Sequence, residues 1–265
     1  MKKILFIINK TSDERYKECI EAINALKRPL LYSLKFASYA AGDVFTTSDA
    51  YLALYEKEKP DISIIMDDTC LYPESTLIEL EWPSEHTPSA ILPGNGIDEF
   101  LVKCTTLYTC ISCIVLNQKK YMAIEVKDRF SHTHLNQCYV QLEMVRKDPQ
   151  FMILRGDNFL LGSGEAGAGR KFKENERAPF CDIFVREYYP ILDYFLDKGL
   201  SREAYEEEKL INLNKVLSWL NNIKKSEDTT HWLIDDDIYE LIEEFYGYEP
   251  YYEDLKEKID SILAN

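Results

Sequence analysis

Two adjacent acidic residues, Asp67 and Asp68, follow an apolar run that begins at Ile62. A short apolar run of this kind is typical of a buried strand. Two carboxylates at its end are costly unless a cation, a hydroxyl group or water satisfies them. Oxygen ligands of this type suit Mg²⁺ and Mn²⁺. The pair is therefore a candidate binding site, and a solvated turn at the end of the strand is the alternative.

The first 70 residues alternate between strand and helix patterns. We expect strands over residues 2–9, 30–37 and 61–66, and helices over residues 12–26 and 46–59, with Ser12 as an N-cap. This alternation predicts a parallel sheet with crossover helices. Ligands of such sheets bind beyond the carboxyl ends of the strands, which is where Asp67 and Asp68 stand.

The remaining chain falls into two parts. We expect a helix over 73–82, a small strand within 86–96, a strand over 106–117, a helix over 134–147 and a strand over 150–156. Four of the ten glycines lie in residues 162–172, which predicts a mobile loop. Only helical patterns follow residue 182. The prediction is an α/β domain over residues 1–180 and a helical region over residues 181–265.

Charge and cysteine usage restrict the functional classes. The net charge is −15, and residues 181–265 carry −12 of it. Binding to a nucleic-acid backbone requires clustered Lys and Arg, so a nucleic-acid partner is disfavoured. The seven cysteines are scattered, which predicts reduced thiols in a cytoplasmic protein. The apolar run near the N-terminus is short, and we interpret it as a first strand rather than a signal peptide.

The string "IIMDDTCLYP" resembles the acidic strand end of GT-A fold nucleotide-sugar glycosyltransferases, family 2-like, of the abequosyltransferase-like branch. In that pattern three consecutive acids precede an apolar pair, an aromatic residue and a proline, and here Thr69 takes the third acidic place. The strings "ILFIINKTSDERYKECIEAINAL", "YTCISCIVLNQKKYMA", "FSHTHLNQCYVQLEMV" and "FMILRGDNFLLGSG" resemble further segments of the family. The resemblance covers about residues 2–170 and rests on the order and spacing of short motifs.

The resemblance implies a GT-A fold and an inverting glycosyltransferase. Such an enzyme moves a hexosyl or deoxyhexosyl group from a nucleotide-diphosphate sugar to a surface-glycan or lipid-linked glycan acceptor. Its donor site would contain Asn9, Lys10 and Thr11, in the loop that meets the nucleotide base, and Asp67 and Asp68. The two acids would also hold Mn²⁺ or Mg²⁺, which neutralises the leaving diphosphate.

The glycine-rich loop carries a second candidate for the donor site. Arg170 would meet the diphosphate if this loop closes over the donor as a lid, and a flexible hairpin is the alternative.

The acceptor side departs from the family pattern. Many inverting members place an acidic base at the start of the helix after the sugar pocket, where this chain has Asn136 and Gln137. An amide cannot accept the proton, so His134 and Asp128 are the candidate bases, with His132 nearby. The alternative is that the histidines only cap the helix.

Several alternatives stay open at the level of the sequence. A catalytically silent GT-A relative would bind glycan or a partner enzyme, and a nucleotidyl-transferring enzyme would use the same fold. We expect the cysteines of "CISC", residues 110–113, to fill the core, and the acids of "DDD", residues 235–237, to decorate a helix start. The apolar face from Ile211 to Ile223 predicts a homodimer through the helical region.

Overall fold

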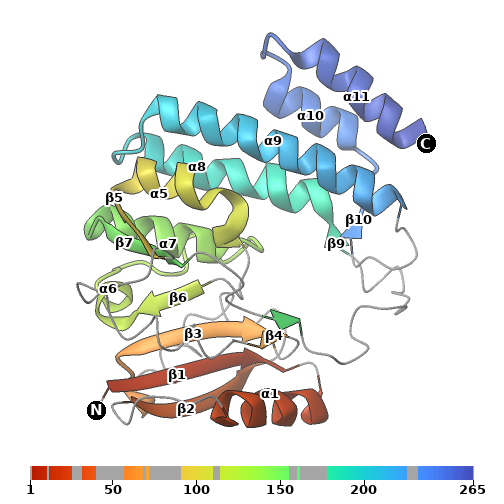
Figure 1. Cartoon of the computed structure of the whole chain (residues 1–265). Coiled ribbons are helices and arrows are strands. Elements are labelled where there is room, and N and C mark those ends of the chain that lie inside the picture. The colour runs from red at the N-terminus through yellow and green to blue at the C-terminus, as the bar shows by residue number, and fades with distance from the viewer. Residues whose placement is uncertain are drawn as a thin grey trace. The chain divides into compact units, whose positions relative to one another are not determined.

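The computed structural model describes residues 2–10, 12–25, 32–39, 57–67, 70–71, 91–109, 114–154, 160–161, 178–225 and 232–264. The chain divides into two compact units, Met1–Ala166 and Gly167–Asn265. The sequence places this boundary slightly later, near residue 180. Figure 1 shows the elements of both units coloured along the chain.

The first unit contains a four-stranded sheet with the order β2-β1-β3-β6. Its strands are β1 (Lys2–Asn9), β2 (Tyr32–Tyr39), β3 (Ile62–Asp67) and β6 (Ile114–Asn117). The first three are parallel and β6 is antiparallel to β3, as the opposed arrows of β3 and β6 show in Figure 1. The predicted mostly parallel sheet is therefore confirmed.

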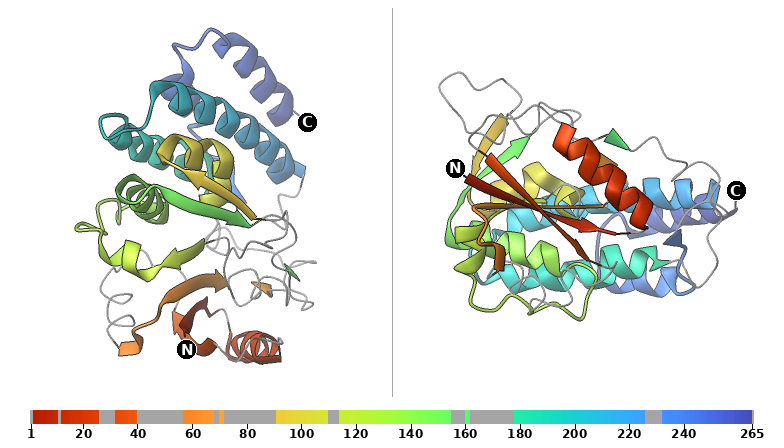
Figure 2. Two further views of the ribbon diagram at one scale, coloured as in Figure 1. Left: turned by 60° about the vertical axis from the view of Figure 1, so that its left-hand side comes forward. Right: turned by 90° about the horizontal axis from the view of Figure 1, so that it is seen from below.

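Helix α1 (Asp13–Ala25) covers one face of this sheet. Its Cys19 and Ile23 pack in one buried cluster with Ile4, Phe6 and Ile8 of β1. Both views in Figure 2 show α1 beside the red and orange strands. The intervening Leu5 and Ile7 are also buried, so β1 is covered on both faces, as a central parallel strand requires.

The start of α1 follows the prediction. The Ser12 hydroxyl accepts a hydrogen bond from the Arg15 backbone N–H at 3.2 Å, so Ser12 is an N-cap. Asp13 and Glu14 then fill the first turn, where acidic side chains interact favourably with the helix dipole. The helix therefore begins immediately after the carboxyl end of β1.

The rest of the first unit consists of further helices, a 3₁₀ turn and short strands. They are β4 (Cys70–Leu71), β5 (Ile91–Asn95), α5 (Ile97–Cys104), η1 (Thr105–Thr109), α6 (Gln118–Met122), α7 (Asn136–Lys147), β7 (Gln150–Leu154) and β8 (Leu160–Leu161). Strand β5 pairs antiparallel with β7, and β4 pairs antiparallel with β8. The predicted helix over 134–147 and strand over 150–156 are confirmed within two residues.

The strand predicted over residues 106–117 is wrong in its first part. Residues 105–109 form the 3₁₀ turn η1, and the described strand β6 covers Ile114–Asn117. The physical reason is the preceding helix α5, whose Phe100 ring lies 5.5 Å from the ring of Tyr108. This packing bends the chain back on α5, whereas the aromatic and β-branched residues alone favour a strand.

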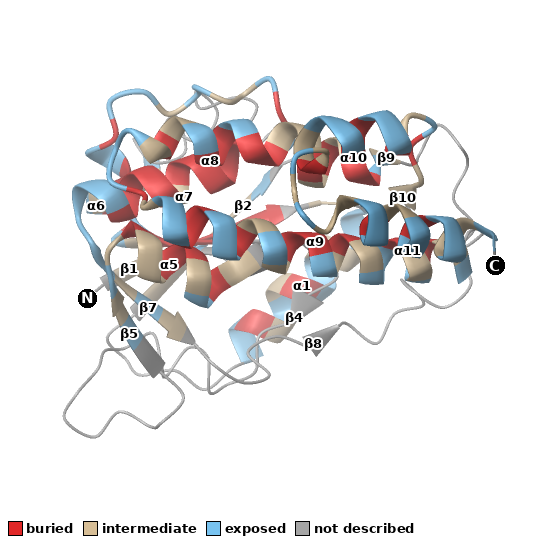
Figure 3. Ribbon diagram, turned by 90° about the horizontal axis from the view of Figure 1, so that it is seen from above, coloured by how far each residue is buried: buried red, intermediate tan, exposed pale blue. Residues whose placement is uncertain are grey.

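The second unit is helical, as predicted. It contains η4 (Asp182–Glu187), α8 (Tyr188–Leu196), α9 (Arg202–Lys225), α10 (Ile238–Tyr246) and α11 (Tyr252–Ala264), with two-residue strands β9 (Ala178–Pro179) and β10 (Trp232–Leu233). Figure 3 shows the buried residues as red bands that recur along α8 and α9. No helix in the described part of the chain has both the length and the apolarity to cross a membrane.

A π-helical turn, η4, precedes Pro190 in the sequence. Proline has no backbone N–H and its ring displaces the carbonyl one turn earlier, which favours an irregular turn at that point. The turn continues directly into α8, so the two form one continuous helical segment.

The acidic triplet at residues 235–237 does more than decorate a helix start. The buried Asp235 carboxylate accepts hydrogen bonds from the backbone N–H groups of Cys181 at 2.7 Å and Asp182 at 2.9 Å. Asp237 pairs with Arg186 at 2.7 Å. The triplet therefore joins α10 to the beginning of η4, and sequence-local reasoning missed this because the partners are more than 50 residues away.

Candidate functional site

The carboxyl ends of β1 and β3 lie side by side. Asn9 is the register partner of Asp67 in the parallel ladder, and Tyr39 is the partner of Asn9 on the other side. The chain leaves β1 for β2 on one side and later enters β3 on the other, so the strand order reverses at β1. Open α/β sheets bind ligands at the carboxyl ends of strands at such a switch point. The structure thus brings together the backbones of two residues that the sequence predicted for one site.

Lys10 follows β1 at this edge, and its ammonium group is already paired. The Lys10 Nζ forms an ion pair with the Asp13 carboxylate and lies 5.8 Å from the centre of the Tyr16 ring. The hydrogen bond and charge of Asp13 raise the pKa of Lys10, and Lys10 in turn lowers the pKa of Asp13. An anionic ligand that takes Lys10 must therefore compete with Asp13.

Tyr16 and Ser38 belong to the same edge, although the sequence did not single them out. Tyr16 is half-buried on α1 and hydrogen-bonds Ser38, which lies one residue before the end of β2. Burial raises the pKa of Tyr16, and the Ser38 hydrogen bond and the Lys10 charge partly oppose this. Helical periodicity assigns Tyr16 to the core, so its polar contact is a result of the tertiary structure.

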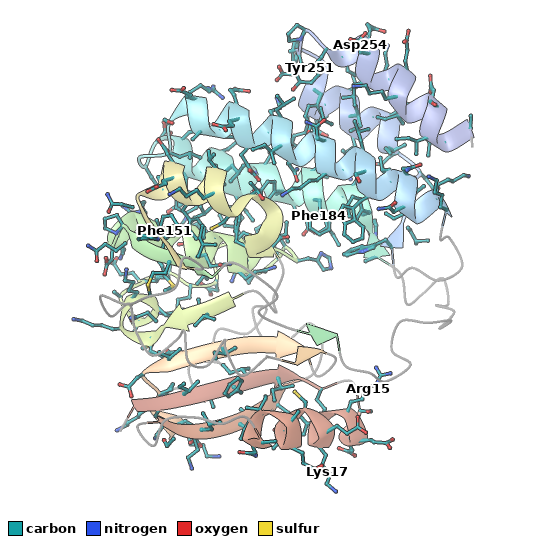
Figure 4. All side chains as sticks on the ribbon, in the orientation of Figure 1. Arg15, Lys17, Phe151, Phe184, Tyr251 and Asp254 are labelled. Carbon is teal, nitrogen blue, oxygen red and sulfur yellow. The ribbon has the colours of Figure 1, made fainter. Side chains whose placement is uncertain are left out.

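Arg15 adds a second cation near this edge, in the first turn of α1. In Figure 4 the Arg15 and Lys17 side chains point away from different sides of the helix. Because α1 begins beside the carboxyl end of β1, Arg15 lies closer to the candidate site along the chain than Lys17 does. The described cations of this edge are thus Lys10 and Arg15.

Several predicted residues lie outside the described part of the chain. They are Thr11, Asp68, Thr69 and Arg170, the "CISC" cysteines and the predicted loop over 162–172. The predicted helices over 46–59 and 73–82 also lie outside it, apart from residues 57–59. Cys19, Cys104, Cys138 and Cys181 are buried. The core-filling prediction concerned Cys110 and Cys113, which lie outside the described residues.

His134 and Asp128, the two candidate bases, are exposed in the segment that joins α6 to α7. The Asp128 carbonyl accepts a hydrogen bond from the Ser131 N–H at 3.0 Å. The neighbouring His132 ring lies 6.0 Å from the ring of Phe130. The exposure of His134 and Asp128 makes both side chains accessible to a substrate.

The two amides at the start of α7 have structural roles. Asn136 accepts a hydrogen bond from the Phe130 N–H at 3.1 Å and donates one to the Lys127 carbonyl at 2.9 Å. Gln137 donates from Nε2 to the Thr109 carbonyl at 3.1 Å. Asn136 thus fixes the turn that carries Asp128. Its amide cannot act as a base itself, but it positions the candidate base Asp128.

Contacts at its two ends connect α7 to different parts of the first unit. Gln137 binds Thr109, and five residues later Ile114 lies opposite Ile65, close to the carboxyl end of β3. The other end of α7 lies beside α6, because Lys147 donates to the Ala123 carbonyl at 3.0 Å. Helix α6 itself follows Asn117, which pairs with Ile62 at the amino end of β3.

A metal site is not assembled within the described residues. None of the described His, Cys, Asp and Glu residues form a group of three or more that could hold a metal ion. The predicted metal ligand Asp67 ends β3 at the switch point, and its neighbour Asp68 lies outside the described residues. The donor chemistry is right for a hard divalent cation, since both predicted ligands supply carboxylate oxygens.

No protein-family model matches this sequence, and a search of curated proteins finds no significant match.

Proposed function

We propose that this protein is a glycosyltransferase that moves a sugar from a nucleotide-diphosphate donor to a glycan acceptor. The observation that carries the proposal is the register of β1 and β3, which places Asn9 beside Asp67 at the switch point of a mostly parallel sheet. The sequence resemblance assigns both residues to the donor site. The adjacent Lys10 supplies positive charge for a diphosphate.

The proposed chemistry divides between two sides of the site. On the donor side, Lys10 and Arg15 stabilise the negative charge that develops on the leaving diphosphate. Mn²⁺ or Mg²⁺ bound by Asp67 and Asp68 would supply further Lewis-acid stabilisation of that charge. On the acceptor side, His134 or Asp128 takes the proton of the attacking hydroxyl, and direct attack inverts the sugar carbon.

A binding screen tests the donor assignment. We expect a nucleoside diphosphate to raise the melting temperature of the full chain, more strongly with added Mn²⁺. A ligand at 100 times its dissociation constant contributes roughly 2.7 kcal/mol of stability. The Asp67→Asn/Asp68→Asn variant should lose this response, whereas the exposed α1 variant Glu18→Gln should keep it. An unchanged response in the double variant would refute the site.

A catalytically silent glycan-binding relative is the second candidate. The structural use of Asn136 and Gln137 favours it, because the helix start then offers no carboxylate. Incubation with nucleotide sugars distinguishes the two. The enzyme releases nucleoside diphosphate, and the silent relative releases none even when it binds a glycan.

A further inference from the structure

A glutamate side chain is enclosed in the helical unit without a charged partner in contact. Glu208 of α9 has no exposed surface. Its Oε1 accepts a hydrogen bond from the Tyr188 hydroxyl of α8 at 2.7 Å. Its Oε2 has no hydrogen-bond partner in the structure. A carboxylate has about four acceptor sites, so one neutral donor is poor compensation for removing the charge from water.

Other buried polar groups share this layer between the helices. Asn212, one turn after Glu208, donates to the Phe184 carbonyl at 2.9 Å and to the Tyr189 hydroxyl at 3.2 Å. The Tyr189 hydroxyl also hydrogen-bonds the Tyr246 hydroxyl of α10. The layer therefore couples η4, α8, α9 and α10 through polar contacts, and Glu208 is its acidic member.

The charges around Glu208 compensate its burial only in part. Lys215 attracts the carboxylate across two helical turns, and Glu207 repels it. Lys209 on the same helix is engaged with Glu249, near the start of α11, and lies 5.2 Å from the Tyr246 ring centre. Burial is the dominant effect and raises the pKa of Glu208 to about 7, although the Tyr188 hydrogen bond and Lys215 act in the opposite direction.

Several tyrosines also lie near this layer. Burial raises the pKa of Tyr189, and the negative charge of Glu208 across the α8–α9 contact raises it further. Burial also raises the pKa of Tyr205, and Asp193 of α8 acts in the same direction. Burial raises the pKa of Tyr251 to about 12. These tyrosines therefore stay neutral between pH 5 and 8, and Glu208 is the described member of the layer that changes charge there.

We propose that Glu208 makes the contact between α8 and α9 pH-sensitive: the protonated acid holds the two helices together, and its ionisation loosens them. The direction follows from proton linkage. Between the ordinary glutamate pKa of 4.5 and the folded value of about 7, the closed form binds a proton that the open form has lost. Rising pH therefore favours the open form through this window, and the effect levels off above it.

Hydrogen exchange of the full chain, read by mass spectrometry on peptides from α8 and α9, tests the proposal. Protection factors corrected for intrinsic exchange should fall by about 70-fold from pH 5 to pH 8 where exchange requires exposure of Glu208. Glu208→Gln keeps an acceptor for Tyr188 and removes the charge, so its protection should be independent of pH. Glu203→Gln, which removes an exposed acid from the first turn of the same helix, is the matched control and should behave like the unmodified chain.

Tyr188→Phe provides a second variant. Loss of the hydroxyl removes a donor that favours the carboxylate, so the fall in protection should continue to a higher pH before it levels off. Infrared spectroscopy of the unmodified chain gives an independent readout, because a protonated carboxyl band should disappear between pH 6 and 8. Protection that does not change with pH, the same pH dependence in Glu208→Gln, or no such band would each overturn the proposal.

Discussion

Lys10 follows β1 at the carboxyl edge of the sheet, and its ammonium group forms an ion pair with the Asp13 carboxylate. We predict that Asp13→Asn strengthens nucleoside diphosphate binding by about 2- to 5-fold, because a ligand phosphate no longer competes with an exposed ion pair. Isothermal titration calorimetry at low ionic strength measures the change. Glu14→Gln, which removes an acid from the same first turn, is the control, and an equal gain in that variant would point to net charge instead.

The acid pair at the end of β3 is the second residue-level test. Asp68→Asn should leave the fold intact and lower turnover by roughly 10²-fold, equivalent to about 2.7 kcal/mol in the activation barrier. The measurement is the release of nucleoside diphosphate from the donor that the binding screen identifies. Full turnover in the Asp67→Asn/Asp68→Asn variant would show that neither acid holds the donor.

At the scale of elements, Asp235 connects α10 to the start of the η4–α8 segment. Asp235→Ala leaves two backbone N–H groups without their acceptor, so the free energy of unfolding should fall by about 1–3 kcal/mol. Urea unfolding followed by circular dichroism measures this loss. Asp236→Ala removes an exposed acid next to it and should change the stability by less than about 0.5 kcal/mol.

The β5–β7 ladder depends on a glycine opposite an aromatic ring. Gly94 is the register partner of Phe151, and a Cβ atom at residue 94 would collide with that ring. Gly94→Ala should therefore destabilise the first unit by roughly 1–3 kcal/mol. In a double-mutant cycle, Phe151→Leu should relieve most of this loss. Purely additive effects would show that the ring moves aside without cost.

At the scale of the whole molecule, fewer residues of the predicted apolar face are available for a contact between two copies of the chain. Leu213, Val216, Leu220 and Ile223 of the predicted apolar face are buried within the chain. Trp219 of that face remains about half exposed, at 49%, and Leu210, which directly precedes the predicted face, is 48% exposed. The Trp219 ring stacks on the Phe180 ring, with 6.1 Å between the ring centres. The Phe184 ring, labelled in Figure 4, contacts the Trp232 ring nearby. Leu210 is therefore the better candidate for a contact between two copies.

Light scattering tests this form of the dimer. We predict about twice the 30.9 kDa chain mass at micromolar concentration, and the mass of one chain for Leu210→Glu, because a two-fold contact would bring the new charges together. Asn222→Glu adds the same charge to another side of α9 and should leave the dimer intact. A monomeric unmodified chain would exclude a dimer at this concentration.

The sequence by itself determined the elements whose signals are local. Alternating strands and helices predicted the parallel sheet, Ser12 predicted the start of α1, and the apolar periodicity after residue 182 predicted the helical unit. These predictions succeed because backbone propensity, capping and amphipathic spacing act over only a few residues.

Only the tertiary structure decided which distant residues meet. It placed Asn9 beside Asp67, joined Tyr16 to Ser38, connected Asp235 to the backbone of residues 181 and 182, and enclosed Glu208 beneath Tyr188. It also turned part of a predicted strand into η1 through packing on α5. Strand order and register depend on contacts between residues far apart in the chain. Local sequence patterns predict which side chains are buried, but not which distant residues they meet.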